Sequence, residues 1–222
     1  MFLCFVGIDG SGKTLQAERL TESLNARGIP SVYTWCRYSP RLLMPLIKLA
    51  KRRIRGKKDS SDYDGFTSSK KGILSRPPLG WIWLNVSLLE YLIQVTFTMR
   101  LRPMGGKALV CDRYIYDALA DLAINLDRSG DGILKLARHP LIRLFPKPDC
   151  VYFLDVPPAV AFRRKDDPNV MAEEYLVDRA KVYSFLSEKL GFMRIDGTRS
   201  IEEIAKTVLN DAVARIKGGG KS

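Results

Sequence analysis

The residues best suited to chemistry stand in one short segment near the start of the chain. Residues 7–14 match the pattern G-x-x-x-x-G-K-[ST]. In such a loop, glycines let backbone N–H groups approach a phosphate, the lysine reaches the β- and γ-phosphates, and the hydroxyl joins a Mg²⁺ shell. The sequence therefore predicts a nucleoside triphosphate site with an associated Mg²⁺ ion. Its expected binding residues are Gly7, Asp9, Gly10, Ser11, Gly12, Lys13 and Thr14.

The elements on either side of this loop are those that a phosphate loop requires. Residues 2–6 form a short apolar run of buried-strand length, and Ala17, Leu20 and Leu24 recur at the spacing of a helix. A helix that begins at the loop directs its N-terminal dipole and free N–H groups at an anion. The order strand, loop, helix supports the phosphate-site interpretation over a Gly-rich turn that carries a lysine by chance.

The rest of the chain alternates between strand-like and helix-like segments, which is typical of a parallel sheet covered on both faces. We predict a three-layer α/β fold with five parallel strands. The expected domain covers residues 1–216, and a disordered tail is expected at 217–222. The expected strands are residues 2–6, 31–36, 108–111, 150–154 and 192–195.

A second candidate site follows the third predicted strand, at Asp112-Arg113-Tyr114. Ligands of open α/β sheets gather at the carboxyl ends of the strands. Asp112 could hold Mg²⁺ through a water or orient the attacking acceptor, and Arg113 could grip an anionic acceptor with two hydrogen bonds. The alternative is a helix-capping aspartate beside a surface arginine. The phosphate loop favours the functional interpretation.

Composition indicates a cytoplasmic enzyme. No secretory signal is visible, and the four cysteines, which lack a C-x-x-C pair, are expected to be buried free thiols. His139 is the only histidine, which argues against a histidine-based triad or metal cluster. Residues 81–99 are long and apolar enough to span a membrane, but Asn85, Glu90 and Gln94 interrupt them. We expect a core helix there.

The charge of the chain is concentrated in residues 37–80. They hold twelve Lys or Arg and three Asp, so they carry nine of the twelve net positive charges. Three alternatives remain for this basic insertion. It could attract anionic substrates, bind nucleic acid, or lie on an anionic membrane surface. We favour a solvated insertion near the acceptor side that attracts substrate mildly.

The motifs together resemble the thymidylate kinases, a family of P-loop nucleoside-monophosphate kinases. The resemblance rests on residues 7–14, on Asp112-Arg113-Tyr114 and on the segment 148–158. It also rests on a basic segment, Arg163-Arg164-Lys165, at the position of the family's lid. Glu173-Glu174-Tyr175 and Tyr183 resemble the helix that follows the lid.

The resemblance implies a P-loop kinase fold with a lid at 160–174, and a homodimer. It also implies phosphoryl transfer from ATP to a nucleoside monophosphate, with dTMP as the first choice. It implies that Lys13 serves ATP, that Thr14 and Asp112 serve Mg²⁺, and that Arg113 holds the acceptor phosphate. The phosphate loop lacks an arginine, so Arg163 and Arg164 are the candidates that neutralise the transferring group. The implied catalytic set is Lys13, Asp112, Arg113, Arg163 and Arg164. The implied acceptor-binding set is Asp9, whose partner is a sugar hydroxyl, together with Arg37, Tyr91, Arg113, Tyr114 and Asp117.

The acceptor side departs from the family pattern. Tyr91 stands near the position where the family has a base-reading arginine, and Asp117 and Asp121 stand where it has a Ser and a Tyr-Gln pair. Aspartates there would accept hydrogen bonds from hydroxyl or amino groups. Two alternatives to a dTMP kinase therefore remain. One is a kinase for another nucleotide, a nucleoside or a small alcohol, and the other is a nucleotide-dependent protein that binds nucleic acid or membrane through 37–80.

Overall fold

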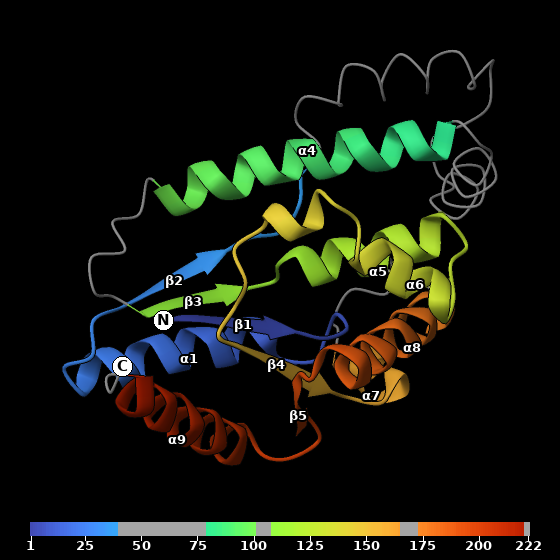
Figure 1. The fold of residues 1–222 in the computed structure, drawn as a ribbon. Helices are drawn as coiled ribbons and strands as arrows, with labels where there is room; N and C mark the ends of the chain where they lie inside the picture. The colour runs from blue at the N-terminus through green and yellow to red at the C-terminus, as the bar shows by residue number, and fades with distance from the viewer. Residues whose placement is uncertain (40–78, 101–107, 165–172, 220–222) are drawn as a thin grey trace, which may run out of the picture.

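The computed structural model describes residues 1–39, 79–100, 108–164 and 173–219. Most of the basic insertion, Lys165 with the rest of the lid's centre, and the last three residues of the tail lie outside these ranges. Figure 1 shows a single parallel sheet with helices above and below it. The predicted three-layer α/β class is confirmed.

The sheet has five strands in the order β2-β3-β1-β4-β5, and all neighbouring pairs are parallel. The strand that precedes the phosphate loop is therefore central, with the Asp112 strand beside it. The bounds are β1 Phe2–Val6, β2 Ser31–Trp35, β3 Ala108–Asp112, β4 Cys150–Asp155 and β5 Met193–Asp196. All five predicted strands are present, and their ends differ from the predicted ones by at most one residue.

Helices cover both faces of the sheet, since parallel strands must be shielded from water on each side. Helices α1 and α9 pack on one face, and the other helices lie on the opposite face or at its end (Figure 1). The bounds are α1 Lys13–Ala26, α4 Leu79–Arg100, α5 Ile115–Asn125, α6 Asp131–Ala137, η1 Ile142–Leu144, α7 Pro158–Arg163, α8 Glu173–Leu190 and α9 Ile201–Gly219.

Helix α9 corrects one predicted boundary. It continues through Gly218 to Gly219, whereas the sequence predicted a tail from residue 217. Two glycines cost a helix only about 1 kcal/mol each, so the last turn can continue past Ile216. A capping box begins the helix, because the Glu203 backbone N–H donates to Ser200 Oγ at 3.2 Å and the Ser200 N–H donates to Glu203 Oε2 at 3.1 Å.

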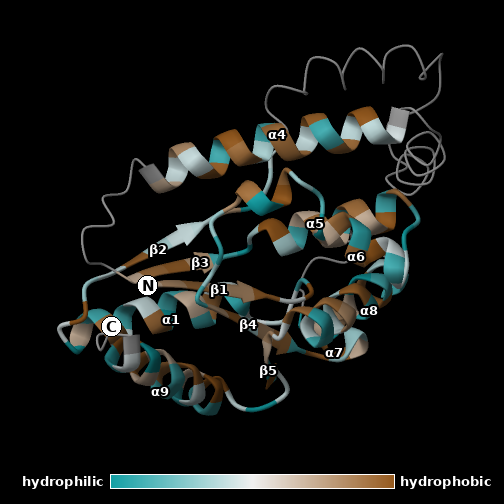
Figure 2. Cartoon of the chain, in the orientation of Figure 1, coloured by the Kyte–Doolittle hydropathy of each residue, from teal (hydrophilic) through white to brown (hydrophobic). Residues whose placement is uncertain are grey.

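The central strands β1, β3 and β4 are mainly hydrophobic (Figure 2), and β1 is buried along its whole length. Its alternate side chains belong to two cores. Leu3 and Phe5 pack toward α1 and α9, whereas Cys4 and Val6 pack toward the core shared with α4, α5 and α8. All four cysteines are buried and free, as the sequence predicted.

Helix α4 passes a length and composition test for a membrane span over Gly80–Met99, the one such span among the described residues. One side of it packs into the core through Leu84, Leu88, Tyr91, Val95 and Met99. A core helix of a water-soluble protein passes the same test, so this feature does not point to a membrane protein. The placement agrees with the core helix that the sequence predicts.

Candidate active site

The phosphate loop connects β1 to α1 through backbone conformations that favour glycine. Gly7, Gly10 and Gly12 have φ angles of 146°, 87° and 88°. Two of them also lie against backbone from distant elements. A Cβ on Gly7 would lie 2.7 Å from the Leu154 carbonyl oxygen, and a Cβ on Gly10 would lie less than 3.0 Å from that of Ala161. The loop is thus fixed between the end of β4 and helix α7.

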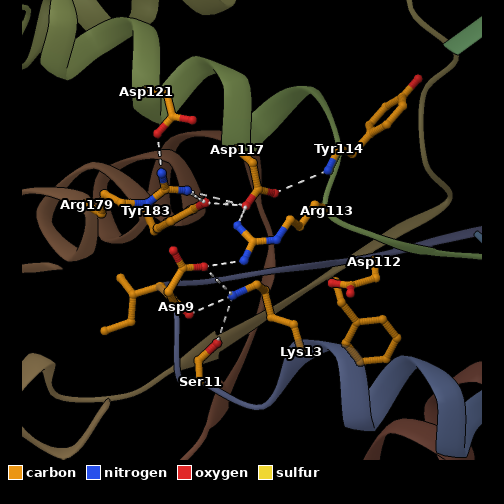
Figure 3. Close-up of polar contacts among 12 residues, drawn as sticks. Asp9, Ser11, Lys13, Asp112, Arg113, Tyr114, Asp117, Asp121, Arg179 and Tyr183 are labelled. Atoms are coloured by element: carbon orange, nitrogen blue, oxygen red, sulfur yellow. Dashed lines mark hydrogen bonds and ion pairs between the residues drawn. The ribbon is translucent and has the colours of Figure 1, made fainter. Parts of the chain in front are cut away.

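Lys13, at the start of α1, has its ammonium turned back onto the loop. Nζ donates to the Ile8 carbonyl oxygen at 2.6 Å and to Ser11 Oγ at 3.4 Å, and it lies 3.9 Å from Asp9 Oδ1 (Figure 3). Burial and the nearby Arg113 charge lower the pKa of Lys13 to about 8, against the opposing effect of the carboxylates. In this conformation the ammonium is therefore held by the loop itself.

Thr14 and Asp112, which the sequence predicts as metal ligands, are directly hydrogen-bonded. Thr14 Oγ1 donates to Asp112 Oδ2 at 2.6 Å, and the Tyr33 hydroxyl donates to the same oxygen at 3.2 Å. The other oxygen, Asp112 Oδ1, is buried and has no hydrogen-bond partner within the described residues. A hydroxyl beside a carboxylate with unused lone pairs fits a hard divalent cation such as Mg²⁺. Tyr33 was not predicted.

Arg113 is held by two carboxylates at the end of β3. Its Nη2 forms an ion pair with Asp9 Oδ1, and its Nη1 lies 3.6 Å from Asp117 Oδ1 (Figure 3). The backbone of Arg113 is left-handed, with φ 64°, and its N–H donates to the Phe5 carbonyl at 3.2 Å. Burial opposes ionisation of Asp9, but the charges of Arg113 and Lys13 outweigh it and lower the pKa of Asp9.

Both carboxylate oxygens of Asp117, on α5, have partners inside the protein. Its Oδ2 accepts the Tyr114 N–H at 3.2 Å, and its Oδ1 accepts the Tyr183 hydroxyl at 2.7 Å and lies 3.5 Å from Arg179 Nη2. Arg179 is fully buried. Its Nη1 forms an ion pair with Asp121, one helical turn after Asp117. The acceptor-binding role of Asp117 therefore stays a prediction, and the observed role is structural support of α5.

The site carries balanced charge, with three cations against three carboxylates in one connected group. These residues are Asp9, Lys13, Arg113, Asp117, Asp121 and Arg179. Charged groups are stable away from water only when they are paired and hydrogen-bonded. The balance means that an anion that enters must compete with internal carboxylates for the cations.

The two aromatic residues predicted at the acceptor lie in the core. Tyr91 is 2% exposed, and its hydroxyl donates to the Cys36 carbonyl. Tyr114 is 0% exposed, and its hydroxyl donates to the Pro146 carbonyl at 2.8 Å. Both rings contact Phe145. In this conformation neither side chain is accessible to a ligand, and both are part of the hydrophobic core. Arg37 is exposed just after β2.

The two candidate lid arginines lie at the end of α7, and both are exposed. Arg163 is the last residue of the helix, and Arg164 Nη1 donates to the Gly197 carbonyl at 3.1 Å. Because Gly10 contacts Ala161 in the same helix, α7 joins the phosphate loop to the base of the lid.

Sequence reasoning missed Arg179, although a signal was present. Tyr175, Arg179 and Tyr183 recur every four residues and so lie on one face of α8. Asp117 and Asp121 share the same spacing on α5. Matching rows of donors and acceptors on two neighbouring helices predict a contact between them. Tyr33 gave no comparable signal, because a tyrosine within a strand is ordinary.

Comparisons with known proteins agree with the geometry. No family model matches the chain. It is 28% identical to the thymidylate kinase of Leptospira borgpetersenii, over 94% of this chain and 91% of that enzyme. It is 25% identical to the probable thymidylate kinase of Staphylothermus marinus, over 93% and 92%, and 24% identical to the thymidylate kinase of Plasmodium falciparum, over 97% and 90%. Similarity to thymidylate kinases of such distant organisms spans nearly the whole chain, and it supports an assignment to the thymidylate kinase family of nucleoside-monophosphate kinases.

Proposed function

We propose that the protein transfers the γ-phosphoryl group of ATP to dTMP and releases dTDP and ADP. The observation that carries this proposal is the position of Arg113 beside the phosphate loop, one residue after the carboxylate that Thr14 binds. One guanidinium can hold an acceptor phosphate in line with a triphosphate held by the loop. The names of the similar proteins support dTMP as the acceptor.

The residues would divide the work as follows. The loop N–H groups and Lys13 bind the triphosphate. Thr14 and Asp112 would hold Mg²⁺, which would supply charge neutralisation to the phosphates. Arg113 orients the acceptor phosphate. Asp9 is ion-paired with Arg113 and so lies beside the proposed acceptor site, where it contacts a sugar hydroxyl of the acceptor. Arg163 and Arg164 would neutralise charge on the transferring group. Catalysis of this kind consists of positioning and electrostatic stabilisation.

A screen of acceptors tests the proposal directly. We expect dTMP, compared with dUMP, dCMP and dGMP, to give the highest kcat/KM for acceptor-stimulated ADP release. A preference above about a thousandfold would mean that a residue other than an arginine at position 91 reads thymine. Activity on free nucleosides or small alcohols, with none on any monophosphate, would contradict the proposal and support a kinase for another small acceptor. Intact ATP binding with no phosphoryl transfer to any acceptor tested would instead support the binding-protein alternative.

We also propose that two copies associate through α4 in the cytoplasm. The exposed side chains of this helix carry no charge in its described part, and most are large and apolar. They are Trp81, Ile82, Val86, Leu89, Ile93, Thr96 and Phe97. Such a stripe can pack against its own copy about a twofold axis.

Light scattering coupled to gel filtration tests this dimer. The wild-type chain should have twice the mass of the 25.1 kDa protomer. Leu89→Glu, in the middle of the stripe, should be monomeric, whereas Lys181→Glu on the exposed side of α8 should leave the mass unchanged. A monomeric wild-type protein would contradict the dimer and leave the proposed reaction untouched.

A further inference from the structure

Asp117 lies between two arginines that belong to different parts of the protein. The same oxygen, Oδ1, is 3.6 Å from Nη1 of Arg113 at the end of β3 and 3.5 Å from Nη2 of Arg179 on α8. The Tyr183 hydroxyl also donates to this oxygen at 2.7 Å (Figure 3). One carboxylate therefore links the arginine beside the phosphate loop to a helix outside the loop.

Arg179 is placed where a charge is costly. Its side chain is 0% exposed, and its Nε has no hydrogen-bond partner within the described residues. The guanidinium lies 5.6 Å and 5.5 Å from the ring centroids of Tyr175 and Tyr183, which add cation–π attraction. A buried ion pair is seldom the most stable filling of a core, because desolvation offsets most of the attraction. Stability alone therefore explains Arg179 poorly.

The charge of Arg179 has a direct consequence for Arg113. An acceptor phosphate must compete with Asp9 and Asp117 for the Arg113 guanidinium. A second cation on Asp117 Oδ1 weakens the pull of that carboxylate on Arg113, because Coulomb interactions inside a protein are strong and screened little. If Arg179 were neutral, Arg113 would be the main cation left to balance Asp117.

We propose that Arg179 is a positioning residue that keeps Arg113 available to the acceptor phosphate by balancing the charge of Asp117. The inference rests on the proposed function, in which Arg113 binds that phosphate. It assigns to α8 a role in the affinity for the acceptor, without contact between Arg179 and substrate.

The kinetic test replaces Arg179 by Met, which keeps the length of the side chain and removes its charge. Arg179→Met should raise KM for dTMP at least about tenfold and change KM for ATP less than about threefold. Adding Asp117→Asn should return the dTMP KM toward the wild-type value, although the melting temperature stays low. Lys181→Met, an exposed cation on the same helix, is the matched control and should change neither KM.

Other outcomes would overturn the proposal. A purely structural role predicts a lower melting temperature with both KM values unchanged, or no recovery in the double variant. If Arg179→Met does not fold, Asp117→Asn is compared with Asp117→Asn/Arg179→Met. Without the Asp117 charge, Arg179 has nothing to balance, so the two should have the same dTMP KM within about threefold, and a tenfold difference would refute the coupling.

A measurement on the resting protein separates this inference from the proposed function. Guanidinium signals in ¹⁵N-arginine-labelled protein report the contacts of Arg113, once Arg113→Lys has identified its signals. Arg179→Met should shift them, and Lys181→Met should not. An unchanged Arg113 signal would overturn the coupling even in an active enzyme. A shifted signal in a protein that phosphorylates no monophosphate would refute the proposed function and leave the coupling intact.

Discussion

Gly10 and Ala161 lie in backbone contact, although one belongs to the phosphate loop and the other to α7, about 150 residues later in the chain. A methyl group on Gly10 would meet the Ala161 carbonyl oxygen at less than 3.0 Å. The loop is therefore packed directly against the helix that bears the candidate lid arginines.

Gly10→Ala tests this contact. The loop or α7 must shift to admit the methyl group, so we expect kcat/KM for ATP to fall at least about a hundredfold. Gly28→Ala is the matched control, because Gly28 also has a positive φ, 73°, but has open space around its Cβ position. The control should lose stability through backbone strain and keep its activity. Equal activity losses in both variants would show that φ strain, not the contact with α7, is responsible.

Lys13 makes triphosphate binding depend on pH. Its pKa is lowered to about 8 in the resting protein, so the amino group loses its proton as pH rises through that value. Affinity for ATP should therefore be full below pH 8 and decline above it. A bound triphosphate favours the charged form, so binding near pH 8 should take up a proton.

Calorimetry in two buffers of different ionisation enthalpy measures this proton uptake. Lys13→Arg keeps its charge throughout the range and should abolish both the proton uptake and the decline. If ATP affinity still declines above about pH 8 in Lys13→Arg, another titrating group causes the decline.

Asp112 Oδ1, which has no hydrogen-bond partner among the described residues, predicts how the reaction rate depends on Mg²⁺ concentration. Asp112→Asn replaces a carboxylate by an amide, so kcat should fall at least about a hundredfold and the Mg²⁺ concentration needed for half-maximal rate should rise. Tyr33→Phe removes a hydrogen bond to Oδ2, the oxygen that Thr14 also binds. It leaves Oδ1 unchanged, so we expect a smaller loss and an unaltered Mg²⁺ requirement. A raised requirement in Tyr33→Phe alone would place the metal at Oδ2.

The lid arginines should act mainly in the transition state. Changing Arg163 and Arg164 together to Ala should lower kcat about 10³-fold, with a smaller effect on ATP affinity. Arg164 already donates to Gly197, so Arg163→Ala should account for more of the loss than Arg164→Ala. Arg19→Ala, which removes an exposed arginine paired with Glu202, is the control. Unchanged kcat with a raised KM would make these arginines simple binding residues.

The sheet, and the strand and helix on either side of residues 7–12, could be predicted from the sequence because both depend on local patterns. A glycine-rich loop between an apolar run and a helix leaves few other structures possible, and strands buried on both faces are continuous apolar runs. Thr14 and Asp112, each predicted as a metal ligand, lie close together because the carboxyl ends of neighbouring parallel strands meet at one edge.

The acceptor side could not be predicted in the same way. Tyr91 and Tyr114 were assigned to substrate from their positions in the chain, but packing around Phe145 decides where their rings point. Arg179 was missed because the four-residue spacing that it shares with Tyr175 and Tyr183 shows a common face of α8, but not that this face packs against α5. Contacts between side chains of different helices depend on the packing angle, which no local pattern specifies.

The buried cysteines give the molecule a set of native reporters. Cys4, Cys111 and Cys150 lie in β1, β3 and β4, and Cys36 follows β2 directly, so each of four adjacent strands has one shielded thiol. Burial raises the pKa of Cys4, Cys111 and Cys150, which makes these thiols still less reactive in the closed sheet. The rate at which a thiol reagent modifies each cysteine, followed by peptide mass spectrometry, would therefore measure how readily each strand becomes exposed to solvent. No label needs to be engineered. The same measurement with nucleotide bound would show which strands the nucleotide protects from exposure.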